Sequence, residues 1–203
     1  MGFYQRVVLP RLLDRAMRDH HLASYRSHTI VAAEGLVLEI GAGSGLNFPC
    51  YPEGVARVVA LDPSPALLRL AAGRGGAARV SVSLLRGAAE RLPFAEAVFD
   101  TIVTTWTLCS LADPVAALRE ARRVLRPGGR LLFVEHGLAP TKRIAVWQHR
   151  LTPCWRAIAG GCHLDRRIDA LIRAAGFRIE SLETGHMPGP QPWTFMYQGS
   201  VVR

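Results

Sequence analysis

LEIGAGSG, at residues 38–45, is the stretch that decides the fold of this chain. Its first residues continue a short apolar run, which predicts a buried strand ending at Ile40. Gly41, Gly43 and Gly45 follow at alternate positions, and glycine lets the backbone turn tightly and approach a ligand with no Cβ in the way. Ligands of open α/β sheets bind outside the carboxyl ends of the strands. The motif therefore predicts a ligand site on a strand-to-helix turn, although taken alone it also fits a tight turn without a ligand.

Short apolar runs on both sides of this loop alternate with helical signals. They predict buried parallel strands over residues 36–40, 57–61, 80–85, 101–104 and 130–134. We predict helices over residues 63–72, 114–125, 142–159, 166–175 and within 5–33, where Pro10 splits or starts a helix, and two more strands over 178–183 and 194–202. Asp62 and Asp113 are N-cap candidates for two of the helices. Alternating strands and helices need crossover connections, so the sheet should be parallel and covered on both faces.

Asp62 closes the next predicted strand, RVVALD, and an acid at this point can accept both hydroxyls of an adenosine ribose. It can equally cap the following helix, and the two roles are compatible. The glycine spacing is G-x-G-x-G, whereas a dinucleotide fingerprint is G-x-G-x-x-G with a helix N-terminus against a pyrophosphate. The glycine loop and the acid do not by themselves separate an enzyme that uses a nicotinamide dinucleotide from one that uses S-adenosylmethionine (SAM). The spacing helps, because SAM has no pyrophosphate, and the rest of the chain supplies the decision.

Two longer stretches extend the pattern: GAAERLPFAEAVFDTIV at 87–103 and LREARRVLRPGGRLLFVEH at 118–136. Together with the glycine loop they resemble the class I SAM-dependent methyltransferases, in detail over residues 34–137. The resemblance implies SAM as cofactor. It assigns Glu39, Gly41, Gly43 and Gly45 to the methionine part, Asp62 to the ribose, Gly87, Ala88 and Ala89 to the adenine edge, and Thr104, Thr105 and Trp106 to positions beside the cofactor. Many relatives carry Asp where this chain has Ala88, so the adenine amino group is left to a backbone or water contact.

The same resemblance implies a Rossmann-like α/β fold with a seven-stranded, mostly parallel sheet, helices on both faces and an antiparallel last strand. We expect a single domain over residues 1–203. Within it, residues 1–33 form an N-terminal helical cap, 34–137 the SAM-binding core, and 138–203 the acceptor-side segment and the final strands. A chain of 203 residues suits one such domain.

A narrower resemblance rests on NFPCYPEG, WTLCSLADP, VEHG, WQHRLTPCWRAIAGGCHLDR and AAGF. These pieces are similar to the methyltransferase-like family of thiol S-methyltransferases and its bacterial homologues. The resemblance implies methyl transfer to a small hydrophobic acceptor, first of all a thiol. The alternatives are N- or O-methylation of a phospholipid or quinone-like molecule, and a SAM-binding protein without catalysis. Animal members begin with a hydrophobic anchor, and MGFYQRVVLPRLLDR has no such run, so we expect a cytoplasmic protein with at most weak membrane-surface association.

Two histidines are candidates for the catalytic residues on the acceptor side. His136 ends the fifth predicted strand, where substrate groups lie in such sheets, or else it is structural. His163, in GGCHLDR, either binds the acceptor or hydrogen-bonds Asp165 and fixes a loop. The candidates for lining the acceptor pocket are Trp106, Trp147, Trp155 and Cys162, and core packing is the alternative for each tryptophan. Cys109 and Cys162 are interpreted as small buried apolar thiols, because methyl transfer needs no covalent enzyme intermediate.

Composition limits the partners. The net charge is +9, but the basic residues are arginines spread along the chain with Lys142 as the one lysine, which favours a solvated basic surface over a nucleic-acid site. We expect a monomer without a nucleic-acid partner. The four cysteines form no CxxC pair and are expected to be free thiols. A zinc site from His149, Cys154, Cys162 and His163 matches no common spacing, so we expect no metal.

Overall fold

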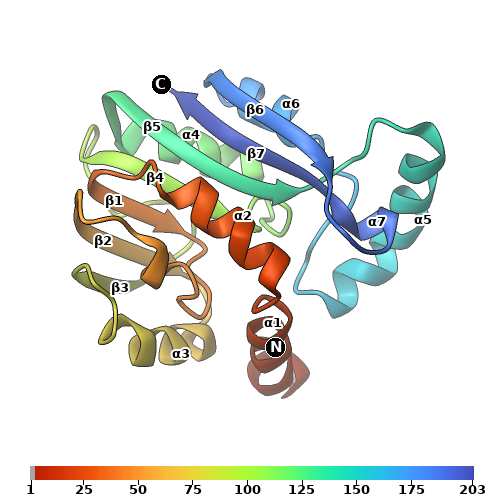
Figure 1. Ribbon diagram of the computed structural model, residues 1–203, viewed down its shortest axis with the longest axis horizontal. Helices are drawn as coiled ribbons and strands as arrows, with labels where there is room; N and C mark the ends of the chain where they lie inside the picture. The colour runs from red at the N-terminus through yellow and green to blue at the C-terminus, as the bar shows by residue number, and fades with distance from the viewer. Residues whose placement is uncertain (1–2) are drawn as a thin grey trace.

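The computed structural model describes residues 3–203 and consists of one seven-stranded sheet with helices packed on it (Figure 1). The strands are β1 (Gly35–Ile40), β2 (Val55–Asp62), β3 (Val82–Arg86), β4 (Phe99–Thr105), β5 (Leu125–His136), β6 (Arg178–His186) and β7 (Phe195–Val202). Their order is β3-β2-β1-β4-β5-β7-β6. The pairs from β3 to β5 are parallel, and β7 runs antiparallel to both of its neighbours. The predicted fold class, including the antiparallel last strand, is confirmed.

Neighbouring residues of the central strands pack on opposite faces of the sheet. In β5, Leu131 and Phe133 belong to one buried cluster and Leu132 to the other. This alternation is the period of two that a strand imposes on its side chains. Because both faces are buried, the strand sequence is a continuous apolar run, which explains why the short apolar runs located the strands so well.

The helices divide between the two faces. One face is covered by α4 (Pro114–Val124) and α6 (Ile168–Ala174), and the other by α2 (His20–Ile30) and α3 (Pro65–Gly75). Figure 1 shows α2 crossing in front of the sheet, while α4 and α6 lie behind it. The remaining helical segments are η1 (Tyr4–Val8), α1 (Leu9–Ala16), η2 (Phe48–Cys50), α5 (Lys142–Ile158) and α7 (Gln191–Thr194).

The order of the strands reverses beside β1. From β1 the chain moves outward to β2 and β3, and then returns to place β4 on the other side of β1. The connections that leave the carboxyl ends of β1 and β4 therefore diverge, and this is the place where open α/β sheets bind ligands. The loop of Gly41, Gly43 and Gly45 lies directly at this point.

Three local expectations are decided by the helix ends. Pro10 lies in the first turn of α1, as a helix-starting proline does. Asp113 caps α4 as expected, since its Oδ1 accepts a hydrogen bond from the backbone N–H of Ala116 at 2.9 Å. The capping role of Asp62 is wrong, because α3 starts later and Ser64 is its N-cap residue, accepting from the N–H of Leu67 at 3.3 Å.

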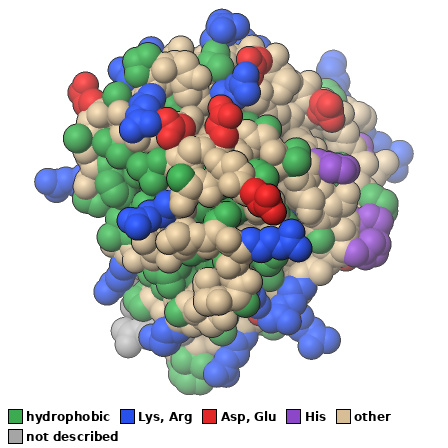
Figure 2. Space-filling model, turned by 60° about the vertical axis from the view of Figure 1, so that its left-hand side comes forward, with side chains coloured by type: hydrophobic (Ala, Val, Ile, Leu, Met, Phe, Trp, Pro, Cys, Tyr) green, Lys and Arg blue, Asp and Glu red, His purple; other side chains and the backbone are tan. Residues whose placement is uncertain are grey.

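On the face that Figure 2 shows, basic side chains are interspersed with acidic ones in the upper half and predominate in the lower half. Arginine side chains occur at separate places around this face, with acidic side chains among those of its upper half. Within residues 3–203, none of the helices is both long enough and apolar enough to span a bilayer.

Candidate active site

The glycine loop after β1 has a left-handed backbone at each of its three glycines. Gly41, Gly43 and Gly45 have φ of 75°, 55° and 79°. A Cβ on Gly41 would lie 2.1 Å from Oγ1 of Thr107, and one on Gly45 would lie 2.5 Å from the ring of Phe48. A Cβ on Gly43 would have its nearest neighbour 4.0 Å away. Gly41 and Gly45 therefore have to be glycine because a side chain there would clash with neighbouring residues, whereas Gly43 borders free space.

Asp62, at the end of β2, is joined directly to this loop. Its Oδ2 accepts a hydrogen bond from the N–H of Gly43 at 2.9 Å, and its Oδ1 accepts from the N–H of Ser64 at 2.8 Å. The side chain is only 5% exposed. Burial raises the pKa of Asp62 above its usual value, and the two backbone N–H groups oppose that shift. Each carboxylate oxygen keeps a second lone pair for a further donor.

Glu39 lies beneath the loop and is 1% exposed. Its Oε1 accepts from the side-chain amide of Asn47 at 2.8 Å, and its Oε2 accepts from the hydroxyl of Tyr51 at 2.7 Å. Burial raises the pKa of Glu39 to about 7, because these two donors and the charge of Arg26 only partly offset desolvation. Glu39 therefore fixes the segment after the glycine loop and places a titratable charge under it.

The residues predicted at the adenine edge follow β3. The N–H of Gly87 donates to the backbone carbonyl of Asp62 at 3.3 Å, which brings this turn beside the predicted ribose site. Ala88 is exposed there, whereas Ala89 is buried in the core cluster with Leu61 and Leu92. The methyl group of Ala89 therefore belongs to the core, and Ala88 is the alanine that faces outward.

Trp106 follows β4 in an unusual backbone conformation. Its φ is 49°, which costs a non-glycine residue conformational energy and redirects its side chain. The guanidinium of Arg26, from α2, lies 5.4 Å from the centroid of the Trp106 ring. Of the two threonines before it, Thr105 accepts a hydrogen bond from Asn47 at 3.0 Å, while the buried hydroxyl of Thr104 has no hydrogen-bond partner among residues 3–203.

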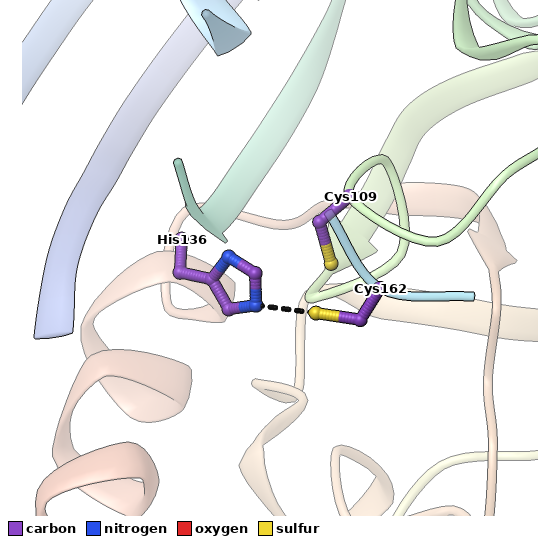
Figure 3. Close-up of side chains that lie close together, drawn as sticks. All are labelled: Cys109, His136 and Cys162. Carbon is purple, nitrogen blue, oxygen red and sulfur yellow. Dashed lines mark hydrogen bonds between the residues drawn. The ribbon is translucent and has the colours of Figure 1, made fainter. Parts of the chain in front are cut away.

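Three side chains meet near the carboxyl end of β5: Cys109, His136 and Cys162 (Figure 3). They come from the loop after β4, the last residue of β5, and the loop between α5 and α6. The Nε2 of His136 lies 2.8 Å from the Sγ of Cys162, and all three potential ligand atoms lie within 4.8 Å of one another. The indole N–H of Trp155 donates to the Sγ of Cys162 at 3.2 Å. The four cysteines are free thiols, as expected.

The loop that carries Cys109 is held by a buried carboxylate. Glu135, just before His136, accepts hydrogen bonds from the backbone N–H groups of Thr107 at 2.9 Å, Leu108 at 3.0 Å and Cys109 at 3.3 Å. Sequence reasoning gave Glu135 no role. The signal that could have found it is an acid inside the otherwise apolar strand LLFVEH, where a buried charge needs donors.

Arg166 holds the same loop from the other side. Its guanidinium donates to the backbone carbonyls of Leu108 at 2.5 Å and Leu111 at 2.8 Å. It belongs to the segment that carries Cys162, so it ties the two cysteine loops together. Sequence reasoning missed this residue too, because no pattern distinguishes one arginine from the many others.

The charges in the cluster favour a thiolate beside an imidazolium. The pKa of the Cys109 thiol is lowered well below its usual value, first by a hydrogen bond from Cys162 and also by the charge of His136. Burial opposes a charge on His136, but the Cys109 thiolate outweighs it and raises the pKa of the imidazole. The pKa of Cys162 is raised by its hydrogen bond to Cys109 and by burial, so Cys162 keeps its proton.

Comparison with known proteins identifies the family. A model described as "Methyltransferase domain" matches residues 38–133. The human protein Thiol S-methyltransferase TMT1B is 35% identical over 170 residues, which are 81% of this chain and 68% of the relative. The chain belongs to the class I SAM-dependent methyltransferases. Demethylmenaquinone methyltransferase of Thermobifida fusca is 34% identical over 154 residues, 72% of this chain and 65% of that protein.

Solved structures agree with this fold. The structure of a SAM-dependent methyltransferase from Thermotoga maritima superposes with a TM-score of 0.70 at 23% sequence identity. The match covers 98% of this chain and 97% of the Thermotoga maritima chain. This methyltransferase spans about two thirds of the length of the two curated relatives, 68% of one and 65% of the other.

The remaining predicted acceptor residues of the methyltransferase have different positions. Trp155 lies in the cluster through its bond to Cys162, and its ring packs on that of Trp193 with centroids 5.8 Å apart. Trp147 is 50% exposed on α5, with Arg150 over its ring at 5.9 Å, so neither core packing nor the Cys162 cluster accounts for it.

His163 is tied to the Cys109 loop through its backbone, and the predicted side-chain hydrogen bond to Asp165 is not formed. The backbone N–H of His163 donates to the carbonyl of Cys109 at 2.8 Å, whereas its Nδ1 lies 3.7 Å from Oδ1 of Asp165, beyond hydrogen-bond distance. Burial and neighbouring arginines lower the pKa of His163. The zinc set considered from the sequence, His149, Cys154, Cys162 and His163, does not gather in the part of the chain that the structure describes. Cys154 is exposed, and Cys162 joins Cys109 and His136 instead.

Proposed function

We propose that SAM lies over residues 41–45 with its ribose hydroxyls on Asp62. The observation that supports this placement is the bond between Asp62 and the N–H of Gly43, which puts the free lone pairs of the carboxylate next to the open space at Gly43. The turn of Gly87 and Ala88 would border the adenine. The charge of Glu39 beneath the loop would complement the cationic methionine end.

We propose that the acceptor is a small hydrophobic thiol. The main support is the similarity to a thiol S-methyltransferase. The structure adds a group of polar and aromatic side chains at the carboxyl end of β5, beside the loop after β4, where an acceptor would meet the SAM methyl group. His136, Cys162, Trp155 and Trp106 are the side chains we assign to this acceptor end.

The chemistry demands positioning more than activation. A lone pair of the thiolate sulfur attacks the SAM methyl carbon, and the bond from that carbon to the sulfonium breaks with its electron pair going to the departing sulfur. Productive geometry holds the two reacting atoms about 3–3.5 Å apart and excludes water. A free thiol has a pKa of about 8.5, so the site must also favour its thiolate. The buried, hydrogen-bonding groups around His136 are suited to that task.

A quinone-like acceptor is the second candidate, because a demethylmenaquinone methyltransferase is similar to this chain at 34% identity. An acceptor screen separates the two. We expect small aliphatic and aromatic thiols to be methylated with the highest kcat/KM, and hydroquinones, phenols and amines to be poor acceptors. Efficient methylation of a hydroquinone with inert thiols would reverse the order of the candidates and leave the SAM site unchanged.

The free cysteines are compatible with the reducing cytoplasm that we expect for this protein. Fractionation of cells that express the full chain would test this location. Recovery of the protein in an oxidising compartment, or with membranes after a salt wash, would contradict it.

A further inference from the structure

Cys109, His136 and Cys162 form a group with the composition of a metal site. Each offers one soft or borderline ligand atom, and these atoms lie within 4.8 Å of one another. Cys109 and Cys162 are buried, 1% and 7% exposed. Figure 3 shows both sulfur atoms and the Nε2 edge of the imidazole directed toward a common point. The three residues are separated in sequence by 27 and 26 positions, so the local motif spacing used to find zinc sites cannot detect them.

A tetrahedral zinc ion would require a small rearrangement of the three ligand atoms, which lie within 4.8 Å of one another. With Zn–S of about 2.3 Å and Zn–N of about 2.0–2.1 Å, ligand atoms lie about 3.5–3.8 Å apart. His136 Nε2 and Cys162 Sγ are at 2.8 Å, so they would need to separate by somewhat less than about 1 Å on metal binding. Cys162 can supply this shift, because it follows Gly160 and Gly161 in a loop. Thiolate and imidazole ligands favour Zn²⁺ over Mg²⁺ or Ca²⁺.

We propose that Cys109, His136 and Cys162 bind a catalytic Zn²⁺ ion whose fourth ligand is the sulfur of the acceptor thiol. Structural zinc sites have four protein ligands, whereas catalytic sites have three and keep one position open. Within the described part of the chain the group has three members, and it lies at the acceptor end of the site. The proposal rests on the thiol acceptor proposed above, and it replaces the expectation of no metal.

Zinc coordination would solve the ionisation problem of the acceptor. The incoming thiol loses its proton to solvent as its sulfur binds the metal, because a coordinating thiol is deprotonated outright. The bound thiolate then forms the new S–C bond while the methyl–sulfonium bond of SAM breaks. The balance is thiol plus SAM giving methyl sulfide, S-adenosylhomocysteine and one proton, and no oxidant or reductant is needed.

The surroundings fit the charges of such a centre. Two thiolates and a neutral imidazole cancel the charge of Zn²⁺, and the acceptor thiolate adds one negative charge, which the sulfonium of SAM complements. The Trp155 N–H already donates to the Cys162 sulfur at 3.2 Å, and the hydroxyl of Ser110 lies 3.5 Å from the Cys109 sulfur. Such bonds to metal ligands orient them and tune the metal. The loop of Cys109 is also fixed in place by the three hydrogen bonds that its backbone N–H groups donate to the side chain of Glu135.

The first test is the metal content of the full chain purified without chelator in the presence of Zn²⁺. We expect one tightly held zinc per chain in the wild type, and its loss in Cys109→Ser, Cys162→Ser and His136→Ala. Cys154→Ser is the matched control, since Cys154 is exposed on α5, and it should retain the zinc. Zinc that is absent from the wild type, or equally present in all variants, would overturn the proposal.

The second test uses the wild type alone and so does not depend on how the variants fold. Replacement of zinc by Co²⁺ should give thiolate-to-metal charge-transfer absorption and the visible bands of a tetrahedral ion, and addition of a small aromatic thiol without SAM should shift both. Two results would contradict the site. One is that the thiols of Cys109 and Cys162 still react fully with a thiol reagent when Zn²⁺ is present, and the other is that the two cysteines are joined in a disulfide.

Methylation measured in parallel separates this inference from the proposed function. If thiol methylation continues at full rate after complete removal of metal by a chelator, the zinc proposal fails and the thiol methyltransferase stands. If zinc binds, but the added thiol neither changes the Co²⁺ spectrum nor is methylated, both the catalytic role of the zinc and the proposed thiol acceptor are wrong.

Discussion

Replacing Glu39 by glutamine should change how the stability of this methyltransferase depends on pH. Burial raises the pKa of Glu39 from 4.5 to about 7 in the folded chain. Glutamine is nearly isosteric and can still accept from Asn47 while donating to the oxygen of Tyr51, so Glu39→Gln should fold normally. Its side chain cannot titrate, and the variant is therefore the reference from which the contribution of Glu39 is measured.

The sign of the effect follows from the raised pKa. The folded state holds the Glu39 proton more tightly than the unfolded state, so this contribution to stability is fully present below pH 4.5 and is lost as the pH rises to about 7. A difference of 7 − 4.5 = 2.5 pKa units corresponds to roughly 3 kcal/mol in total. Of this, roughly 2–3 kcal/mol should disappear between pH 5 and pH 8.

Urea unfolding at pH 5, 6, 7 and 8 measures this directly. The free energy of unfolding of the wild type relative to Glu39→Gln should fall by roughly 2–3 kcal/mol across the series, while groups shared by both proteins cancel. A difference that is independent of pH would refute the reasoning. It would mean that the two hydrogen bonds keep Glu39 ionised throughout.

The remaining predictions concern the SAM site. Asp62→Ala should weaken SAM binding by about 1.5–3 kcal/mol, roughly 10- to 150-fold, because hydrogen bonds to a charged acceptor are lost; unchanged affinity in calorimetry would remove Asp62 from the ribose site. Gly43→Ala should cost only about 1–2 kcal/mol of stability for its left-handed backbone, yet obstruct SAM, since its Cβ enters the open space. Gly45→Ala should instead cost about 2–5 kcal/mol in thermal or urea unfolding, because its Cβ would lie 2.5 Å from Phe48; equal stability of the two variants would contradict this difference. SAM affinity should rise about tenfold from pH 6 to pH 8 as Glu39 ionises under the cationic cofactor, and Glu39→Gln should abolish that rise; a pH-independent affinity in the wild type would show that Glu39 does not sense SAM.

Most of the fold could be predicted from the sequence because its strands are buried on both faces. Each central strand is a short apolar run, and the segments between them begin with proline and a capping residue, as at Asp113. The errors are at element ends. β5 is assigned from Leu125, five residues before the predicted start, but its partners on β4 pass from Leu125 directly to Arg130, so Pro-Gly-Gly at 127–129 forms an irregularity in the ladder. The turn signal marks this interruption, but it cannot show that Leu125, before it, already pairs with β4.

The site was predictable where one motif carries it and obscure where distant segments meet. The glycine loop and Asp62 are found from the sequence because each closes a recognisable strand. The meeting of Cys109 with Cys162 and the support from Glu135 and Arg166 depend on how two loops fold over β5, and no local pattern records that. Cys109 and Cys162 looked like ordinary buried thiols because burial was all that their apolar surroundings could indicate.

The most direct measurement follows the methyl group itself. The full chain is incubated with SAM carrying a deuterated methyl group and a small aromatic thiol, and the products are weighed by mass spectrometry, with Asp62→Ala as the weakened control. We predict that the wild type forms the deuterated methyl sulfide, with one S-adenosylhomocysteine for each sulfide. At limiting SAM, Asp62→Ala should form both products more slowly than the wild type. Consumption of SAM with the label on no thiol, or no dependence on Asp62, would contradict the account.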